Sequence, residues 1–272
     1  MPYVLKNKYG FKILTMPPLT RTLGPWFRTY PGNKANSISE EIQLMNEIID
    51  KLPKFDYFTQ CFHYELTNWL PFYWRGFSQT TRYTYIFEDL SKPDLIWKNI
   101  RKKVKKPIQK AERNIIIRDD LGVETLLRIN RKTYDRQGLK TPFPDELVRR
   151  VVNACISHDC GKMFFAEDSK GNIHATQFIV WDKNSAFGII SAADPVFRSS
   201  GAQLFVKWHA IQFARNFTNR FDFQGSMMKN VETVFRGFGA QQKRYFSISK
   251  TNSLGIRIYL NLLSYKDLIF QK

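Results

Sequence analysis

The sequence predicts an α/β protein in which helices flank a mixed β-sheet. Short runs of aromatic and β-branched residues, typical of strands, alternate along the chain with apolar residues at helical spacing. Hydrophobic residues make up 43% of the 272 residues and aromatic residues 15%, which supplies a large core. This composition excludes disordered, collagen-like and coiled-coil chains, and no fixed-period repeat indicates a solenoid or propeller. The length fits one large domain or two ordinary ones.

The first third of the chain predicts a mixture of strands and one long helix. Residues 11–15 form a short strand that ends before a Pro-Pro pair, and residues 37–52 place apolar side chains at helical spacing. Residues 55–64 and 82–87 then predict two strands, because they are rich in aromatic and β-branched residues.

The middle and C-terminal parts predict a basic helix followed by alternating strands and helices. Residues 94–113 form the basic helix, which Pro107 either kinks or divides. Residues 163–167 and 174–181 form a hairpin around a Ser-Lys-Gly-Asn turn. The elements expected after the hairpin are a strand at 186–192, a glycine-containing loop, a helix at 202–216, a strand at 221–223, a helix at 230–236, a strand at 244–249 and a C-terminal helix within 251–272 that packs back on the body.

The charge of the chain predicts an anionic partner. The 42 basic and 24 acidic residues give a net charge of +18, of which residues 1–92 carry only +3, residues 93–150 carry +8 and residues 151–272 carry +7. Such a field favours nucleic acid, acidic lipid, or phosphorylated cofactors and substrates, and the charge alone leaves these open.

Targeting and redox features predict a cytoplasmic protein. No run of residues approaches the roughly 18 apolar positions that a membrane span needs, and the N-terminus has no secretion signal. The three cysteines are too few for a disulfide framework, and an odd number cannot all pair within one chain. The histidines and cysteines have no metal-ligand spacing, so we expect no metal site.

The segment from residue 189 to residue 202 is the most informative for chemistry. A strand ending near Ile190-Ser191 leads into Arg198-Ser199-Ser200-Gly201-Ala202, which begins a helix. Backbone N–H groups and the positive end of the helix dipole can hold an anion there, and Arg198 can add a charge-assisted contact. Gly201 would allow a phosphate to approach the backbone closely. An ordinary helix start with a solvated arginine is the alternative interpretation.

The order of these elements resembles the GNAT acyltransferase superfamily. In that family an Arg/Gln-x-x-Gly-x-Gly/Ala loop holds the pyrophosphate of acyl-coenzyme A. Arg198 and Gly201 match the first and fourth positions of the loop, whereas Gln203 stands where the family has Gly or Ala. The resemblance therefore implies acyl-CoA, and acetyl-CoA in particular, as co-substrate, bound by residues 198–202, with backbone N–H groups at Ile190 and Ser191 polarising the acyl carbonyl.

Other segments are similar to one branch of the superfamily, the FemAB-type and related polysaccharide-biosynthesis acyltransferases. They are Trp97 with Ile108-Gln109-Lys110-Ala111-Glu112-Arg113, Thr133-Tyr134-Asp135-Arg136-Gln137-Gly138, Phe221-Asp222-Phe223-Gln224-Gly225-Ser226 and Phe235-Arg236-Gly237-Phe238-Gly239. The branch implies two tandem GNAT-like halves, of which the first is degenerate. We expect an N-terminal half at residues 1–92 on the acceptor side, a basic connecting helix at 93–113, an acyltransferase domain at 114–250 and a C-terminal segment at 251–272.

The chain departs from the family where a proton donor is expected. Many GNAT enzymes place a tyrosine four residues before a Gly-Phe pair, and this chain has Thr233 there. The branch commonly has Phe-Lys before its Phe-Gly, where this chain has Phe235-Arg236. The positive charge is kept, but the compact ammonium of lysine is replaced by the planar guanidinium of arginine. We count Arg236 among the catalytic candidates, and the identity of the proton donor stays open.

Polar residues on the strand at 221–223 supply the other catalytic candidates. Alternation puts Asp222 and Gln224 on one face and the two phenylalanines on the other. Polar groups in a covered sheet need partners or a cleft, so Asp222, helped by Gln224, is a candidate to accept or orient the acceptor's proton. A structural aspartate bonded to backbone is the competing interpretation.

Two further segments are candidates for partner binding. An aromatic loop could line an acceptor pocket by stacking on sugar or base, or could equally fill an interface between the halves. The candidate acceptor-binding residues are Trp69, Tyr73, Trp74 and Arg75. Eight basic residues within 98–113 form either a solvated face or a contact for tRNA phosphates, an anionic membrane or a nucleotide-linked acceptor.

The sequence therefore predicts an enzyme, an N-acyltransferase that moves an acyl group from acyl-CoA to an amine by direct attack. The acceptor is expected to be a small molecule, such as an amino sugar, or a cell-envelope precursor lying between the halves. Aminoacyl-tRNA, which FemAB relatives use, is the alternative donor. A non-catalytic basic module that binds nucleic acid or acidic membrane is the competing class.

Overall fold

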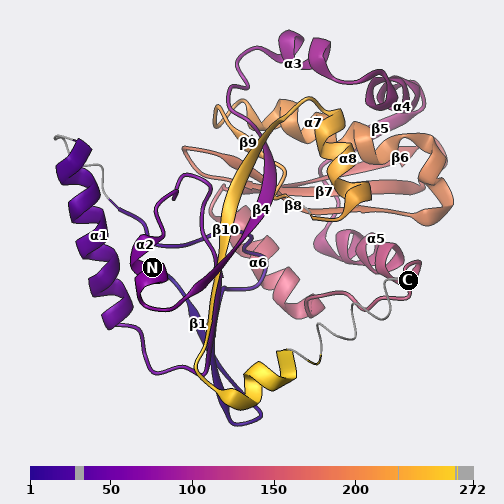
Figure 1. Cartoon of the computed structure of the whole chain (residues 1–272). Helices are drawn as coiled ribbons and strands as arrows, with labels where there is room; N and C mark the ends of the chain where they lie inside the picture. The colour runs from indigo at the N-terminus through magenta and orange to yellow at the C-terminus, as the bar shows by residue number, and fades with distance from the viewer. Residues whose placement is uncertain (28–33, 226, 261, 263–272) are drawn as a thin grey trace. The chain divides into compact units, whose positions relative to one another are not determined.

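The computed structural model of the chain describes residues 1–27, 34–225, 227–260 and 262. The chain divides into two compact units, and the chain crosses between them within β4 (Ser78–Phe87) and β10 (Gln241–Thr251). We call residues 83–243 the central unit, and residues 1–82 with those from 244 onward the terminal unit. Figure 1 shows the elements of both.

The terminal unit contains a small sheet with the strand order β1-β2-β3-β10. Its elements besides β10 are β1 (Val4–Lys8), β2 (Phe11–Thr15), β3 (Tyr57–Cys61), α1 (Lys34–Asp50) and α2 (Leu70–Trp74). β2 pairs with β3 in parallel, and the other two pairs are antiparallel. The buried core of this unit is rich in aromatic rings: Leu14, Met45, Phe58, Phe62, Phe72, Phe77 and Ile248.

The central unit contains the mixed sheet that the sequence predicts, with the strand order β4-β9-β8-β7-β6-β5. Its remaining strands are β5 (Ile115–Arg118), β6 (Gly161–Asp168), β7 (Ile173–Trp181), β8 (Ala186–Ala193) and β9 (Phe221–Asp222). Strands β5 to β8 run antiparallel, β8 pairs with β9 in parallel, and β9 pairs with β4 antiparallel. The hairpin of β6 and β7 is confirmed, and the Asp168 carboxylate closes its turn by accepting the N–H groups of Lys170 and Asn172.

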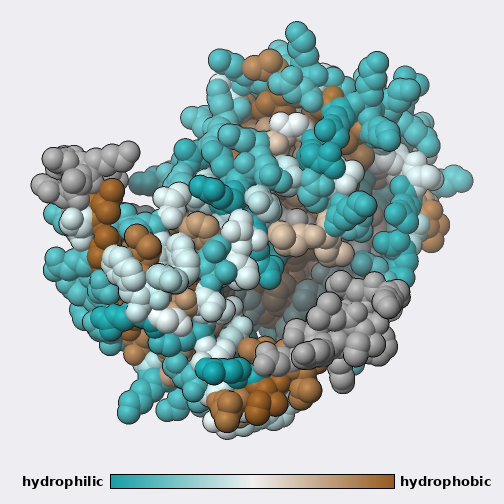
Figure 2. All heavy atoms as spheres, viewed as in Figure 1, coloured by the Kyte–Doolittle hydropathy of each residue, from teal (hydrophilic) through white to brown (hydrophobic). Residues whose placement is uncertain are grey.

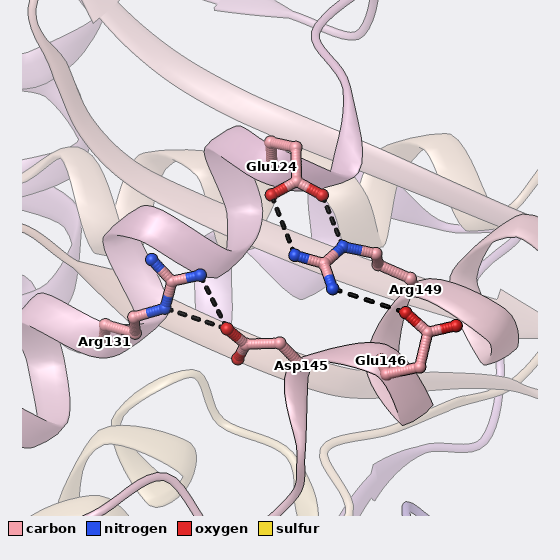
Figure 3. Close-up of polar contacts among 5 residues, drawn as sticks. All are labelled: Glu124, Arg131, Asp145, Glu146 and Arg149. Atoms are coloured by element: carbon pink, nitrogen blue, oxygen red, sulfur yellow. Dashed lines mark hydrogen bonds and ion pairs between the residues drawn. The ribbon is translucent and has the colours of Figure 1, made fainter.

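Helices cover both faces of this sheet (Figure 1). They are α3 (Pro93–Asn99), α4 (Lys102–Glu112), α5 (Val123–Asp135), α6 (Asp145–Ser157), the 3₁₀ helix η1 (Pro195–Ser200), α7 (Ala202–Ala214) and α8 (Lys229–Gly237). α7 packs on β5 to β8 and α4 packs on α7, whereas α5 and α6 pack against the opposite face. Ion pairs from Arg149 to Glu124 and from Arg131 to Asp145 tie α5 to α6 (Figure 3).

The basic segment at 94–113 is two helices, and the break does not lie at Pro107. α3 ends at Asn99, Ile100 and Arg101 have extended backbone, and α4 starts at Lys102 with Pro107 inside it. The Arg101 N–H donates to the carbonyl of Gly237 at 2.9 Å, so a contact to α8 stabilises the break.

The expected connecting helix is instead an integral part of the central unit. Val104, Ile108 and Ala111 on one side of α4 are buried in its core, as is Ile100. The basic side chains lie on the other side, and Lys105 also contacts the Trp97 ring. Their polar character is visible at the top of Figure 2, where hydrophilic residues cover much of the region of α3 and α4.

Other boundaries also differ from the expected ones. The strand expected at 221–223 ends at Asp222, because the chain then turns into left-handed backbone. The compact units do not coincide with ranges 1–92 and 114–250, since β10 returns the chain to the terminal unit at residue 244. Residues 254–260 are helical, and most of the expected C-terminal segment at 251–272 lies outside the described residues.

Candidate active site

The parallel strands β8 and β9 part soon after they meet. They pair only at Ala186 with Phe221 and at Phe187 with Asp222, and the Ala186 N–H donates to the Arg220 carbonyl at 2.9 Å. Within the part of the chain that the structure describes, no strand pairs with the outer edge of β8 beyond these residues. The backbone of β8 from Gly188 to Ala192 therefore has no strand partner among the described residues on this edge, where β9 turns away, and we call this stretch the open edge.

A β-bulge in β8 sets which amide faces this edge. Phe178 pairs with Ile190 and Ile179 pairs with Gly188, so Ile189 is the extra residue. Past the bulge, the Ala193 N–H donates to the Thr133 hydroxyl at 3.0 Å, and this hydroxyl donates to the Ala193 carbonyl at 2.9 Å. Because Thr133 belongs to α5, both backbone groups of Ala193 point away from β7. Because alternate residues face the same edge, the Ser191 N–H also points to the open edge, whereas that of Ile190 points to β7.

The loop after β8 is anchored from α5. Asp194 accepts the Val196 N–H at 3.0 Å, which caps η1, and the Lys132 ammonium at 2.5 Å. Burial raises the pKa of Asp194, and the hydrogen bonds from Lys132 and Val196 outweigh it, so the pKa lies below its usual range. The loop that begins α7 is thus held by a charged pair and a cap.

Packing against α4 requires a glycine at position 201. It adopts left-handed backbone at φ +82°, and a Cβ there would lie 2.2 Å from the Pro107 carbonyl oxygen of α4. A glycine is therefore needed here for the packing of α4, and the approach of a phosphate to the Gly201 N–H stays a prediction.

The donors of this loop nevertheless suit an anion. The Ala202 N–H is capped by the Ser200 hydroxyl at 3.2 Å, but the N–H groups of Gly201 and Gln203 have no partner among the described residues. Successive N–H groups around a left-handed residue form an anion-binding concavity. The Arg198 side chain is exposed and makes no ion pair within the described ranges. Two amides and a guanidinium are a donor set that fits a diphosphate.

A cavity of about 350 Å³ lies beside this loop. Lys110, Lys170 and Ser200 are among its lining residues, and the Lys110 ammonium donates to the Ser199 carbonyl at 3.1 Å. One wall is the His174 ring, stacked on Phe197 at 3.9 Å between centroids. The two lysines outnumber the single carboxylate of Asp168 in the lining, so the cavity keeps a net positive charge that favours anions.

Asp222 is buried and holds the turn after β9. Its Oδ1 accepts the Thr84 hydroxyl at 2.5 Å and the Gln224 N–H at 2.7 Å. Gln224 itself has φ +65°, so the alternation that predicted both polar side chains on one face ends at Asp222. The contacts of the Asp222 carboxylate are those of a structural aspartate, and its role toward an acceptor's proton stays a prediction.

Arg236 belongs to a polar network on α8 that the sequence did not reveal. Its Nε donates to Glu232 at 2.8 Å, and Glu232 also accepts the Tyr85 hydroxyl at 2.5 Å. Burial first, and then the bond to Glu232, raise the pKa of Tyr85. A tyrosine thus lies beside α8 although position 233 is a threonine, and it comes from β4, which pairs with β9.

Lys207, in the middle of α7, is a further polar residue that the sequence did not reveal as part of the site. Its side chain is 6% exposed, and its ammonium donates to the Gln177 side chain of β7 at 2.8 Å. The signal was present, because Lys207 shares a helix face with Ala210, Ile211 and Ala214, all buried.

The acceptor-binding candidates lie in the terminal unit. Tyr73 and Trp74 of α2 are more than half exposed, and the Trp69 ring meets that of Tyr73 edge to face at 5.4 Å. Arg75 forms a two-point ion pair with Asp50. The rings therefore offer an exposed aromatic surface, and their predicted role in binding an acceptor stays a prediction.

Neither the Cys155 thiol nor the possible metal ligands form a second reactive centre in the described part of the chain. Burial, and then Cys160, raise the pKa of the Cys155 thiol to about 11, which disfavours the nucleophilic thiolate. Over the described ranges, no cluster of His, Cys, Asp and Glu side chains could hold a metal ion. Among the same residues, no helix has both the length and the apolar character needed to cross a bilayer.

Comparison with known proteins identifies the domain. Residues 98–228 match the family model of the acetyltransferase (GNAT) domain, and no curated protein matches the chain in sequence. A structure described as FemX is similar with a TM-score of 0.65 and 9% identity, over 90% of this chain and 83% of that one. The L-PGS structure from Bacillus licheniformis is similar with a TM-score of 0.57 and 10% identity, over 95% and 83%. A tandem GNAT protein from the clavulanic acid pathway is similar with a TM-score of 0.51 and 9% identity, over 83% and 73%. These likenesses confirm the predicted fold.

Proposed function

We propose that this acyltransferase, whose residues 98–228 form a GNAT domain, moves an acyl group from acyl-CoA to the amine of a small-molecule or cell-envelope-precursor acceptor. The parting of β8 from β9 is the observation that carries the proposal. It opens a strand edge, with its amides, beside a loop whose donors suit a diphosphate.

The donor's diphosphate is proposed to bind the N–H groups of Gly201 and Gln203 and the Arg198 guanidinium. The two amides lie at the positive end of the thirteen-residue helix α7, where the helix dipole favours an anion. Lys110 and Lys170 at the neighbouring cavity favour a further phosphate group. Acetyl-CoA is the preferred member of this donor class.

The acyl carbonyl is proposed to lie against the open edge of β8. There the Ser191 N–H donates to the oxygen on which negative charge develops during attack. One such preorganised donor accelerates acyl transfer by about 10² to 10³. Asp222 is proposed to take up or orient the proton that the attacking amine loses, through its hydrogen bond to Thr84.

The acceptor is proposed to be an amino sugar or an envelope precursor that carries a sugar. Exposed rings at Tyr73 and Trp74 suit stacking on a sugar ring, since both side chains of α2 are more than half open to solvent. Acetyl-CoA and a panel of amino sugars test the function directly, with release of the CoA thiol as the readout. Thiol release that depends on an amine supports the proposal, and its absence with every amine counts against acetyl-CoA as donor.

Aminoacyl-tRNA is the second candidate donor, favoured by the exposed basic residues of α3 and α4 and by the FemAB resemblance. A tRNA contact through several phosphates weakens steeply with salt. Lys102→Ala/Lys103→Ala/Lys106→Ala removes three exposed charges of α4 while leaving its buried side intact. Transfer from aminoacyl-tRNA that falls in this variant, with no transfer from acetyl-CoA, would favour the second donor. Salt-sensitive tRNA binding without any transfer would favour a basic binding module.

A further inference from the structure

Lys207 is a buried cation with unused hydrogen-bonding capacity. An ammonium has three N–H donors, and only the 2.8 Å bond to Gln177 Oε1 satisfies one of them among the described residues. The Phe235 ring of α8 also faces Lys207, with its centroid 5.7 Å from the ammonium nitrogen. No carboxylate pairs with it within the described ranges. A cation in such surroundings is costly unless something else pairs with it.

The surroundings of Lys207 lie beneath the open edge of β8. Gln177 of β7 is the register partner of Ser191, so their side chains project from the same face of the sheet. Gln177 also lies under Gly188, where a Cβ would be 3.4 Å from its amide nitrogen and 3.6 Å from the Phe221 ring. Gly188 is the first residue of β8 after its last pair with β9.

A second unsatisfied polar group lies on the same face. The Ser191 hydroxyl oxygen is buried and has no hydrogen-bond partner among the described residues. Buried polar groups are nearly always paired, so an unpaired one requires an explanation. Lys207 and Ser191 therefore both have unused hydrogen-bond donors on the face of the sheet where β8 and β9 part.

We propose that Lys207 is the acid that protonates the sulfur of the departing CoA thiol. The assignment rests on the proposed function, because it places the thioester over the open edge of β8. It fills the role for which the family's tyrosine is missing at Thr233, and it explains why a lone lysine occupies the buried face of α7. The Ser191 hydroxyl donates a second hydrogen bond to the same sulfur.

The step balances in protons and electrons. The acceptor nitrogen forms a bond to the thioester carbon and loses one proton toward Asp222 and solvent. The carbon–sulfur bond breaks with its electron pair going to sulfur, and the Lys207 ammonium gives that sulfur a proton. Lys207 is left as a neutral amine, which is tolerated in this buried place, and solvent returns a proton to it after the thiol leaves.

The ionisation of Lys207 is suited to this step. Burial lowers the pKa of Lys207 to about 8, so the ammonium form predominates at pH 7. The pKa of an ordinary thiol is about 8.5, and proton transfer between groups of matched pKa is efficient. The groups that contact the Lys207 ammonium among the described residues are the Gln177 amide of β7 and the Phe235 ring of α8, and neither of them carries a charge or titrates.

Lys207→Met tests the assignment with two donors and one acceptor amine. With acetyl-CoA we expect kcat to fall by about 10² or more while KM changes less than threefold, because general acids contribute about 10² to 10⁴. With an acetyl thioester of a nitro-substituted thiophenol, whose thiolate leaves unprotonated, the variant should lose less than fivefold in kcat/KM. The exposed Lys183→Met is the matched control and should keep both activities.

The outcomes separate the acid from other roles. A kcat with acetyl-CoA within threefold of the unmodified protein overturns the assignment, and so does an equal loss with both thioesters. If Lys207→Met does not fold, the unmodified protein decides, since kcat with acetyl-CoA should fall above pH 8 and kcat with the aromatic thioester should not. An unmodified protein without any transfer refutes the proposed function and not the role of Lys207 within it.

Discussion

Removing the buried charge of Lys207 should change how stability depends on pH. The ordinary pKa of lysine is 10.5, and burial lowers it to about 8 in the folded chain. Below pH 8 the ammonium is charged in both states, so the folded state bears the full cost of burying it. As pH rises from 8 to 10.5 the folded state loses its proton first, and the unfolded state then binds more protons, so this cost disappears.

The size of the effect follows from the shift. A difference of about 2.5 pKa units corresponds to about 3 kcal/mol, of which about 2.5 kcal/mol is lost between pH 7 and pH 10. Lys207→Met should therefore gain stability relative to the unmodified protein at pH 7 and lose most of this relative gain by pH 10. The Gln177 oxygen left unpaired costs about 1–3 kcal/mol at every pH, so it shifts the difference without changing its slope.

Urea unfolding of the two proteins between pH 7 and pH 10 measures this difference, because all other titrating groups cancel between them. A difference in unfolding free energy that stays constant over this range would show that Lys207 is solvated or paired in the folded chain. The structural basis for its role as an acid would then be lost.

Three further substitutions or reactions test the packing around the site. Gly201→Ala should lower the free energy of unfolding by about 3 kcal/mol, because alanine is strained in the left-handed backbone at this position and its Cβ clashes with the Pro107 carbonyl. A change under about 1 kcal/mol in urea unfolding would contradict that contact. Thr133→Val should lower it by about 1–3 kcal/mol, since it removes the hydroxyl that bonds the backbone of Ala193, and unchanged stability would mean that solvent replaces those bonds. The Cys155 thiol should react with iodoacetamide at pH 8 more slowly than a thiol in an unstructured peptide, as peptide mass spectrometry can follow, because its pKa is raised, and equal rates would refute its burial.

The sequence predicted the strands and helices of the central unit well, because each is a local pattern. The hairpin of β6 and β7 is encoded by a turn, and α7 by apolar residues at helical spacing. The loop at Arg198 was predicted for the same reason, since a strand, a glycine and a helix start follow each other in the chain.

What the sequence could not predict depends on residues far apart along the chain. The need for Gly201 comes from Pro107, which reaches it only through the packing of α4 on α7. Tyr85 comes next to Glu232 only because β4 pairs with β9. The break between α3 and α4 likewise depends on a backbone bond to α8. Pro107 predicted a break because proline lacks the N–H that a helix needs, but the observed break lies at Ile100 and Arg101, where the Arg101 N–H bonds Gly237.

Calorimetric titration with coenzyme A tests the central claim most directly, that the loop before α7 holds the diphosphate of an acyl donor. The unmodified protein should release heat on binding, and Arg198→Ala should bind about tenfold or more weakly, because a charge-assisted bond to phosphate contributes about 1.5–3 kcal/mol. Lys140→Ala, which removes an exposed charge outside this loop, should bind as the unmodified protein does. Absence of heat with the unmodified protein, or equal affinity in all three, would contradict the claim.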